Sequence, residues 1–205
     1  SEETEAVRGA VRGSVHPVSE VTRRWNPIDI RVTIQYIRVY PHPVPVPAFV
    51  AHLRTFVGTE MLWLPGASAV VINDDGHLLL GRRSDNLLWA LIIGILEPGE
   101  QPADAIVREV FEEAGIRIRA EAVISLSTDE AVVYPNGDWA QYLNITFLCS
   151  VAQGTAFVAD DENVEFGWFP PDALPADLVP TSRTRIERTL EFLLEPGAGP
   201  WYSVG

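Results

Sequence analysis

Between residues 67 and 169 the chain alternates short apolar runs with clusters of polar, turn-forming residues. Runs of this length, bounded by Asn, Asp and Gly, are typical of β-strands and of the hairpins that join them. Tight turns are predicted at Asn73–Gly76 and Asn136–Gly137, where these residue types stand together. We predict strands at Ala67–Ile72, Leu78–Leu80, Ile116–Leu126, Ala131–Val133, Tyr142–Val151 and Phe166–Phe169, and a buried apolar segment at Trp89–Leu96.

Helical periodicity is found in two stretches, Gln101–Ala114 and Ser182–Leu194, where apolar residues recur at intervals of three and four. Pro47–Glu60 is predicted as a shorter helix and Pro170–Leu174 as a helical turn. Strands interleaved with helices are typical of layered α/β domains. The pattern therefore predicts the α/β fold class, and we find no internal repeat in it.

The first 47 residues differ from the rest of the chain. A strand-like run, Ile28–Tyr40, is followed by prolines at positions 41, 43, 45 and 47, a spacing that favours extended polyproline geometry. We predict an N-terminal extension with a proline-rich linker over residues 1–47, one domain over residues 48–196 and a tail over residues 197–205. The role of the extension and the formation of a homodimer stay open at this point.

Composition narrows the choice of partners. The formal net charge of -13 argues against binding to nucleic acid or to an anionic membrane, since both require a basic surface. Cys149 is the only cysteine, which excludes a disulfide within the chain and suits the reducing cytoplasm. No apolar run approaches the roughly 20 residues of a membrane span. We expect a cytoplasmic protein that acts on a small molecule.

The predicted helix Gln101–Ala114 has one apolar and one acidic face. Pro102 suits its first turn, and Gly115 supplies the left-handed residue that ends it. Clustered carboxylates repel one another and favour a bound cation, and oxygen ligands without His or Cys select Mg²⁺ or Mn²⁺. A solvated acidic face is the alternative. The apolar side, expected in the core, holds Ile106, Val107, Val110, Phe111 and Ala114, and the acidic side holds Glu109, Glu112 and Glu113.

A longer pattern contains this helix: Gly94, five residues, Glu100, seven residues, and then the run from Arg108 to Ile116. It resembles the complete Nudix box, in which every specified position is matched. The resemblance implies the family's α/β/α sandwich with a mixed β-sheet. It also implies an Mg²⁺-dependent hydrolase, with Mn²⁺ as an alternative metal. Such an enzyme cleaves a phosphoanhydride bond in a nucleoside diphosphate linked to another group, for example a (d)NTP, ADP-ribose or another sugar nucleotide.

The resemblance also implies roles for single residues. Metal ligands are expected to be Glu109, Glu112 and Glu113, with the Gly94 carbonyl and with Glu100 acting directly or through water. Catalysis is assigned to Glu112, Glu109 and a loop glutamate, for which Glu162 is the first choice. Arg108 is expected to anchor the loop by pairing with a box carboxylate. Substrate contacts are expected from Arg82 and Arg83, as phosphate ligands, and from Tyr142, as an aromatic that stacks on a base.

The chain departs from the family just before the box. Many members have Pro-Gly-Gly there, whereas this chain has Ile92-Ile93-Gly94, and β-branched Ile93 does not readily adopt a positive φ angle. We expect a changed loop or a longer strand. A non-catalytic nucleotide or sugar-nucleotide sensor is the second hypothesis, disfavoured because all box carboxylates are present. An isoprenoid diphosphate isomerase is the third, disfavoured because Cys149 has no evident partner.

Overall fold

The computed structural model describes residues 24–25, 30–31, 46–134, 136–195, 197 and 199–202. Two short strands, β1 (Arg24–Trp25) and β2 (Ile30–Arg31), pair antiparallel. The rest of the predicted strand over residues 28–40, and the prolines at positions 41, 43 and 45, lie outside the described residues. The prediction of an extension and linker over residues 1–47 therefore stays a prediction.

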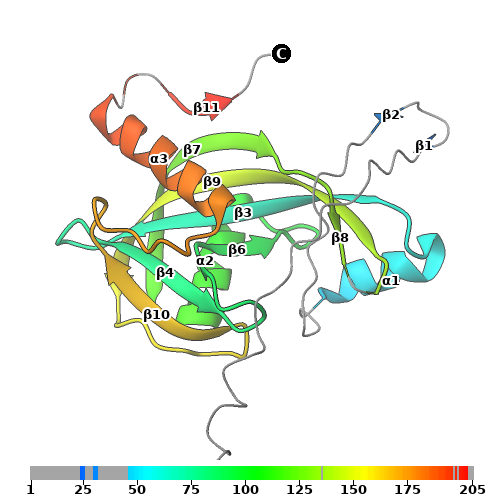
Figure 1. Ribbon diagram of the computed structural model, residues 1–205, viewed down its shortest axis with the longest axis horizontal. Coiled ribbons are helices and arrows are strands. Elements are labelled where there is room, and N and C mark those ends of the chain that lie inside the picture. The colour runs from blue at the N-terminus through cyan, green and yellow to red at the C-terminus, as the bar shows by residue number, and fades with distance from the viewer. Residues whose placement is uncertain are drawn as a thin grey trace, which may run out of the picture.

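A mixed β-sheet forms the centre of the molecule (Figure 1). Strand β3 runs parallel to β9, and β11 runs parallel to β7, while the other neighbouring pairs are antiparallel. The order of strands across the sheet is β10 (Asn163–Phe169), β4 (Leu78–Arg83), β3 (Leu62–Ile72), β9 (Trp139–Gln153), β7 (Arg117–Thr128) and β11 (Trp201–Tyr202).

One edge of β3 is shared between two partners. Ile72 of β3 pairs with Leu78 of β4, and residues Gly66 to Ala69 of β3 pair with β6 (Ile92–Ile95). Strand β5 (Trp89–Ala90) pairs with β4, and β8 (Val132–Val133) pairs with β9. The sheet therefore divides at this edge of β3. Ile92 and Ile93 lie in β6, a strand separate from β5, and the expectation of a changed loop or a longer strand stays a prediction.

Helices cover both faces of the sheet (Figure 1). On one face α2 (Pro102–Ala114) packs on odd-numbered residues of β3, which alternate with the even-numbered residues that face α3 (Pro180–Leu194). A short helix, α1 (Ala48–Val57), lies at one end. The core on the α2 face includes Ala67, Ala69, Val71, Ile106, Val110 and Phe147, and that on the α3 face Val70, Leu78, Leu80, Leu91 and Ile186. The predicted α/β/α sandwich with a mixed sheet is confirmed.

Two predicted elements differ from the structure. The predicted helical turn at residues 170–174 is limited to one hydrogen-bonded turn, in which the Ala173 amide donates to the Pro170 carbonyl at 3.0 Å, because Pro175 disfavours a helical conformation at Leu174. The predicted tail contains β11, which pairs with Ser125 and Leu126 of β7. In the part of the chain that the structure describes, no helix is long and apolar enough to cross a membrane.

Phe111 was expected in the core and is 45% exposed. It lies near the end of α2, where the Arg117 guanidinium covers its ring at 4.8 Å from the centroid. Ile106, Val110 and Ala114 are buried as expected. The buried face of α2 is therefore narrower than the apolar side that the sequence pattern predicts. The Phe111 ring is covered by the Arg117 cation instead of by the sheet.

Candidate active site

Gly94 of β6 and Glu109 of α2 are in direct contact. Gly94 lies in β6, paired with Ala67 of β3, and the side chain of Glu109 on α2 packs against its Cα. A Cβ atom at residue 94 would overlap the Cγ and carboxyl atoms of Glu109. Glycine is therefore required here for close approach of a strand to a helix, and its φ angle is not positive.

Replacing Gly94 with Ala should displace the Glu109 carboxylate. A misplacement of about 1 Å near reacting groups lowers rates by about 100-fold, so we expect a loss of that order in kcat for the Gly94→Ala variant. Steady-state kinetics against the wild type would measure it. Gly197→Ala is the matched control, since nothing lies within 4 Å of the added methyl group. Equal activity of Gly94→Ala and Gly197→Ala would contradict this role.

Arg108 joins three box carboxylates. Its Nε and Nη2 donate to Glu100 at 2.8 and 3.0 Å, and Nη1 donates to Glu109 at 3.0 Å and to Glu112 at 2.9 Å. Nη2 also approaches the Ile95 carbonyl at 3.4 Å. The expectation that Arg108 anchors the loop by pairing with a box carboxylate is confirmed.

Glu100 helps to hold the loop that precedes α2. Its Oε2 accepts from the Glu97 amide at 3.1 Å, and both of its oxygens accept from Arg108. The Arg108 hydrogen bonds are the main cause that lowers the pKa of Glu100. With both oxygens engaged, Glu100 acts as a positioning group in this structure, and its role in metal binding stays a prediction.

Glu113 is buried, unlike the two other glutamates of the acidic face. It is 6% exposed, and its Oε2 accepts from the Asn163 side-chain amide at 2.7 Å. Asn163 packs against Gly81 of β4, where any Cβ would overlap its amide group. Asn163 was not identified from the sequence, because it follows Glu113 by 50 residues and no local pattern distinguishes it.

The loop at residues 154–162 carries Glu162 to the box helix. The amides of Phe157 and Ala159 donate to the carbonyls of Ala114 and Glu113 at 3.0 Å each, which satisfies the last turn of α2. The Ser84 amide donates to the Glu162 carbonyl at 2.8 Å. Glu162 is therefore held between β4 and α2, and the alternative of a freely solvated acidic loop does not describe this residue.

Glu109, Glu112, Glu113 and Glu162 form an acidic cluster with more negative charges than nearby arginines. Burial is the largest cause that raises the pKa of Glu109, Glu113 and Glu162, and repulsion from neighbouring carboxylates raises each pKa further. Arg108 counteracts the shift at Glu109, and Arg83 counteracts it at Glu162. Partly buried carboxylates that repel one another favour a bound cation.

The cluster fits a divalent ion by the chemistry of its donors. In the described parts of the chain, no three His, Cys, Asp or Glu side chains already converge on a metal position. Instead, Arg108 Nη1 lies between Glu109 Oε1 and Glu112 Oε2, where a cation shared by these carboxylates would be stabilised. An ion shared by these two carboxylates at that position would replace Arg108 Nη1, while the bidentate pair of Arg108 with Glu100 would be unaffected.

The pH dependence of the metal-free protein follows from these shifts. In the unfolded chain the three carboxyls titrate near 4.5, and in the folded chain they titrate higher. Between these values the native state binds more protons, so raising the pH lowers the free energy of unfolding. We expect Tm without metal to fall from about pH 5 to pH 7.5, with a shallower slope for Glu113→Gln. Identical slopes for the two proteins would contradict the raised pKa of Glu113.

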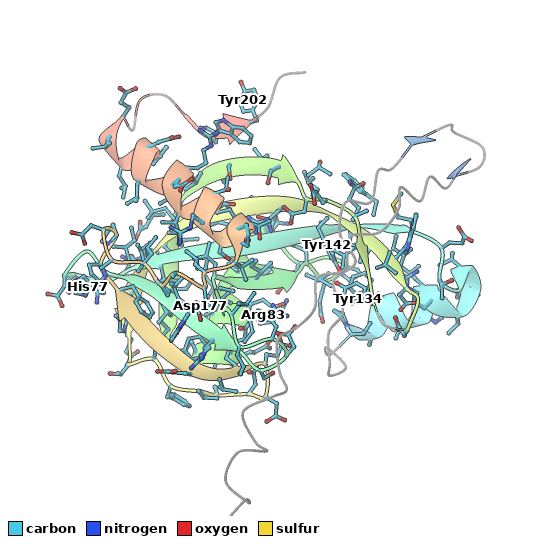
Figure 2. All side chains as sticks on the ribbon, in the orientation of Figure 1. His77, Arg83, Tyr134, Tyr142, Asp177 and Tyr202 are labelled. Atoms are coloured by element: carbon cyan, nitrogen blue, oxygen red, sulfur yellow. The ribbon has the colours of Figure 1, made fainter. Side chains whose placement is uncertain are left out.

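The two arginines that were predicted to bind phosphate, Arg82 and Arg83, have different surroundings. Arg82 donates to the Leu87 carbonyl at 3.2 Å and lies 3.7 Å from Glu165, in an exposed pair. Arg83, labelled in Figure 2, is bidentate with Asp85 at 2.9 and 2.7 Å and is close enough to influence Glu162. Arg83 is thus the better placed of the two for a phosphate near the box.

Tyr142 lies on the opposite face of the sheet from α2. Its hydroxyl is 2.8 Å from that of Tyr134, and both rings belong to a small apolar cluster with Val50 and Leu64 (Figure 2). Stacking of Tyr142 on a base stays a prediction.

Comparison with known proteins identifies the family of this chain independently of the pattern from Gly94 to Ile116. A family model described as "NUDIX domain" matches residues 62–189. The chain is 31% identical over 133 residues to a "MutT-like protein" of Streptomyces ambofaciens, covering 65% of this chain and 77% of the relative. It is 32% identical over 142 residues to mouse "8-oxo-dGDP phosphatase NUDT18", covering 66% of this chain and 39% of the relative. A solved "NUDIX hydrolase from Nitrosomonas europaea" superposes with a TM-score of 0.54 at 26% identity, covering 63% of this chain and 90% of that one.

Proposed function

This chain belongs to the Nudix hydrolase family, and from that membership we propose that it is an Mg²⁺-dependent enzyme that cleaves the phosphoanhydride bond of a nucleoside diphosphate linked to another group. The candidate substrates are (d)NTPs, ADP-ribose and other sugar nucleotides. Mn²⁺ is the alternative metal. We further propose that the enzyme acts in the cytoplasm on small molecules and binds neither nucleic acid nor membranes.

One observation supports the proposal most strongly. Glu162 lies close to the glutamates of the acidic face of α2, and the positive charges nearby do not balance these carboxylates. Glu109 and Glu113 each have a pKa raised by burial and by the neighbouring carboxylates, Glu162 among them. A protein that used this face only for solubility would leave the glutamates exposed and apart. The arrangement instead suits hard cations and the phosphate groups they bind.

The chain's own residues have distinct roles in the proposed reaction. Glu109, Glu112 and Glu113 would hold the metal, together with the Gly94 carbonyl. When bound, Mg²⁺ would neutralise the charge of the phosphate groups and lower the pKa of a water molecule. Glu162, with its raised pKa, accepts the proton of the attacking water near neutral pH. Arg83 offers a guanidinium to a phosphate oxygen at the same end of the site.

The competing functions predict other arrangements. A sensor that had lost catalysis would not need a buried loop carboxylate with a raised pKa beside the box. An isoprenoid isomerase would need a reactive thiol, whereas burial raises the pKa of Cys149 to about 12 and its Sγ faces the Phe147 carbonyl at 3.8 Å. The hydrolase is therefore the function that the geometry supports best.

A substrate panel tests the proposal. The panel contains the four dNTPs, 8-oxo-dGTP, ADP-ribose, a UDP-sugar, NAD and a dinucleoside polyphosphate, each with Mg²⁺ or Mn²⁺, and products are separated by ion-exchange chromatography. We expect metal-dependent release of a nucleoside monophosphate from at least one class. Tight binding of nucleotides with no product from any class would favour the sensor.

A further inference from the structure

Strand β10 contains a β-bulge close to its first residue. Asn163 pairs with Arg83 of β4. Glu165, two residues later, pairs with Arg82, so β10 uses two residues where β4 advances by one. Val164, the extra residue, is 51% exposed. An inserted residue of this kind interrupts the alternation of side chains between the two faces of a sheet and changes the direction of the side chains beside it.

The bulge places Asn163 on the α2 face of the sheet. Phe166 and Trp168 pack against the core on that face. With regular alternation Val164 would share their face, and Asn163 would point to the opposite one. Instead, the Asn163 side chain reaches α2 and lies over Gly81 of β4, where any Cβ atom would overlap its amide group. Both the bulge and the glycine are therefore needed to place this amide beside α2.

The amide holds one oxygen of Glu113 without neutralising its charge. Asn163 Nδ2 donates to Glu113 Oε2 at 2.7 Å, and both side chains are buried. Among the described residues the structure shows a donor for Oε2 alone, so Oε1 is left for a metal ion. Glu100 differs, because both of its oxygens accept from the Arg108 guanidinium. A neutral donor fixes the orientation of a carboxylate and preserves the negative charge that a cation requires.

We propose that Asn163 is a positioning residue that sets the metal affinity of the site by fixing the orientation of the Glu113 carboxylate. Replacing a donor that orients a metal ligand typically lowers metal affinity by about 10- to 100-fold. The inference rests on the proposed function, because it takes Glu113 as a metal ligand. The alternative is a purely structural role, in which Asn163 only satisfies a buried oxygen and its loss lowers stability alone.

Mn²⁺ binding to the full chain without nucleotide tests the inference, with free Mn²⁺ followed by electron paramagnetic resonance. Asn163→Leu keeps the branched shape of the side chain and removes the donor, so we expect Mn²⁺ to bind about 10- to 100-fold more weakly than to wild type. Gly81→Ala keeps the donor but displaces it, and should weaken binding in the same direction. Val164→Ala changes the exposed residue of the same bulge and should leave the Mn²⁺ affinity unchanged.

A double-mutant cycle separates positioning from stability. Because Asn163 acts through Glu113, Asn163→Leu should weaken Mn²⁺ binding much less in the Glu113→Gln background than in wild type. Thermal unfolding is recorded for each variant, and the titrations are made at a temperature at which all variants are folded. Gly81→Ala takes the place of Asn163→Leu in the cycle if the latter does not fold.

The outcomes for Asn163 and for the hydrolase are distinct. Wild-type Mn²⁺ affinity in folded Asn163→Leu, or an equal loss of affinity in both backgrounds, would overturn the inference. Hydrolysis of the substrate panel by wild type is measured separately. Turnover by wild type, together with unchanged affinity in Asn163→Leu, refutes only the role of Asn163. The expected loss of affinity without any turnover by wild type refutes only the proposed hydrolase, and absence of Mn²⁺ binding by wild type refutes both.

Discussion

Replacing Glu112 with Gln is expected to reduce kcat/KM by about 1,000-fold, because a lost charged ligand removes several kcal/mol of transition-state stabilisation. This variant separates catalysis from folding, because the Glu112 side chain is 54% exposed and, among the residues that the structure describes, its side chain accepts a hydrogen bond only from Arg108 Nη1. An exposed ion pair contributes about 0–1 kcal/mol to folding, so stability should hardly change. Steady-state kinetics and thermal unfolding measure the two effects.

The matched control for this variant is Asp104→Asn. Asp104 lies in the first turn of the same helix and outside the acidic cluster, and its substitution removes the same charge. It should lower stability slightly, through the helix dipole, and keep full activity. Comparable loss of activity in both variants would show that the net charge of α2 matters, and not the position of Glu112.

Replacing Glu162 with Gln is expected to lower kcat by about 100- to 1,000-fold through loss of the general base. The pKa of Glu162 is raised by burial and then by Asp160, which suits a group that must accept a proton near neutral pH. The acidic limb of the wild-type kcat/KM profile should therefore be absent in the variant. Mn²⁺ affinity, followed by electron paramagnetic resonance, should stay close to that of wild type.

Asp161→Asn serves as the neighbour control, because Asp161 is exposed in the same loop. It should retain both the rate and the pH profile of wild type. If Glu162→Gln instead kept its rate and lost Mn²⁺, Glu162 would be a metal ligand and the base would have to be sought within the box.

Local signals in the sequence predict α2 well. Pro102 stands in the first turn and Gly115 ends the helix in the left-handed conformation, with φ of 66°, as expected. Arg108 pairs with the box as expected, since its partners lie within eight residues. These features depend on residues close in sequence, so short-range patterns are sufficient to predict them.

Long-range packing accounts for what the sequence does not reveal. Glu113 was placed on the acidic face, but a loop more than 40 residues later covers it, and Asn163 at the start of β10 donates to its carboxylate. Periodicity cannot show a contact made by a distant segment.

Titration of Mg²⁺ into EDTA-treated wild type, with the best substrate of the panel, tests the central claim most directly. The account predicts no turnover without metal, saturable activity as Mg²⁺ is added, and no recovery by Glu112→Gln at the Mg²⁺ concentration that saturates wild type. Equal rates for wild type with and without Mg²⁺, in the continued presence of EDTA for the metal-free sample, would contradict it.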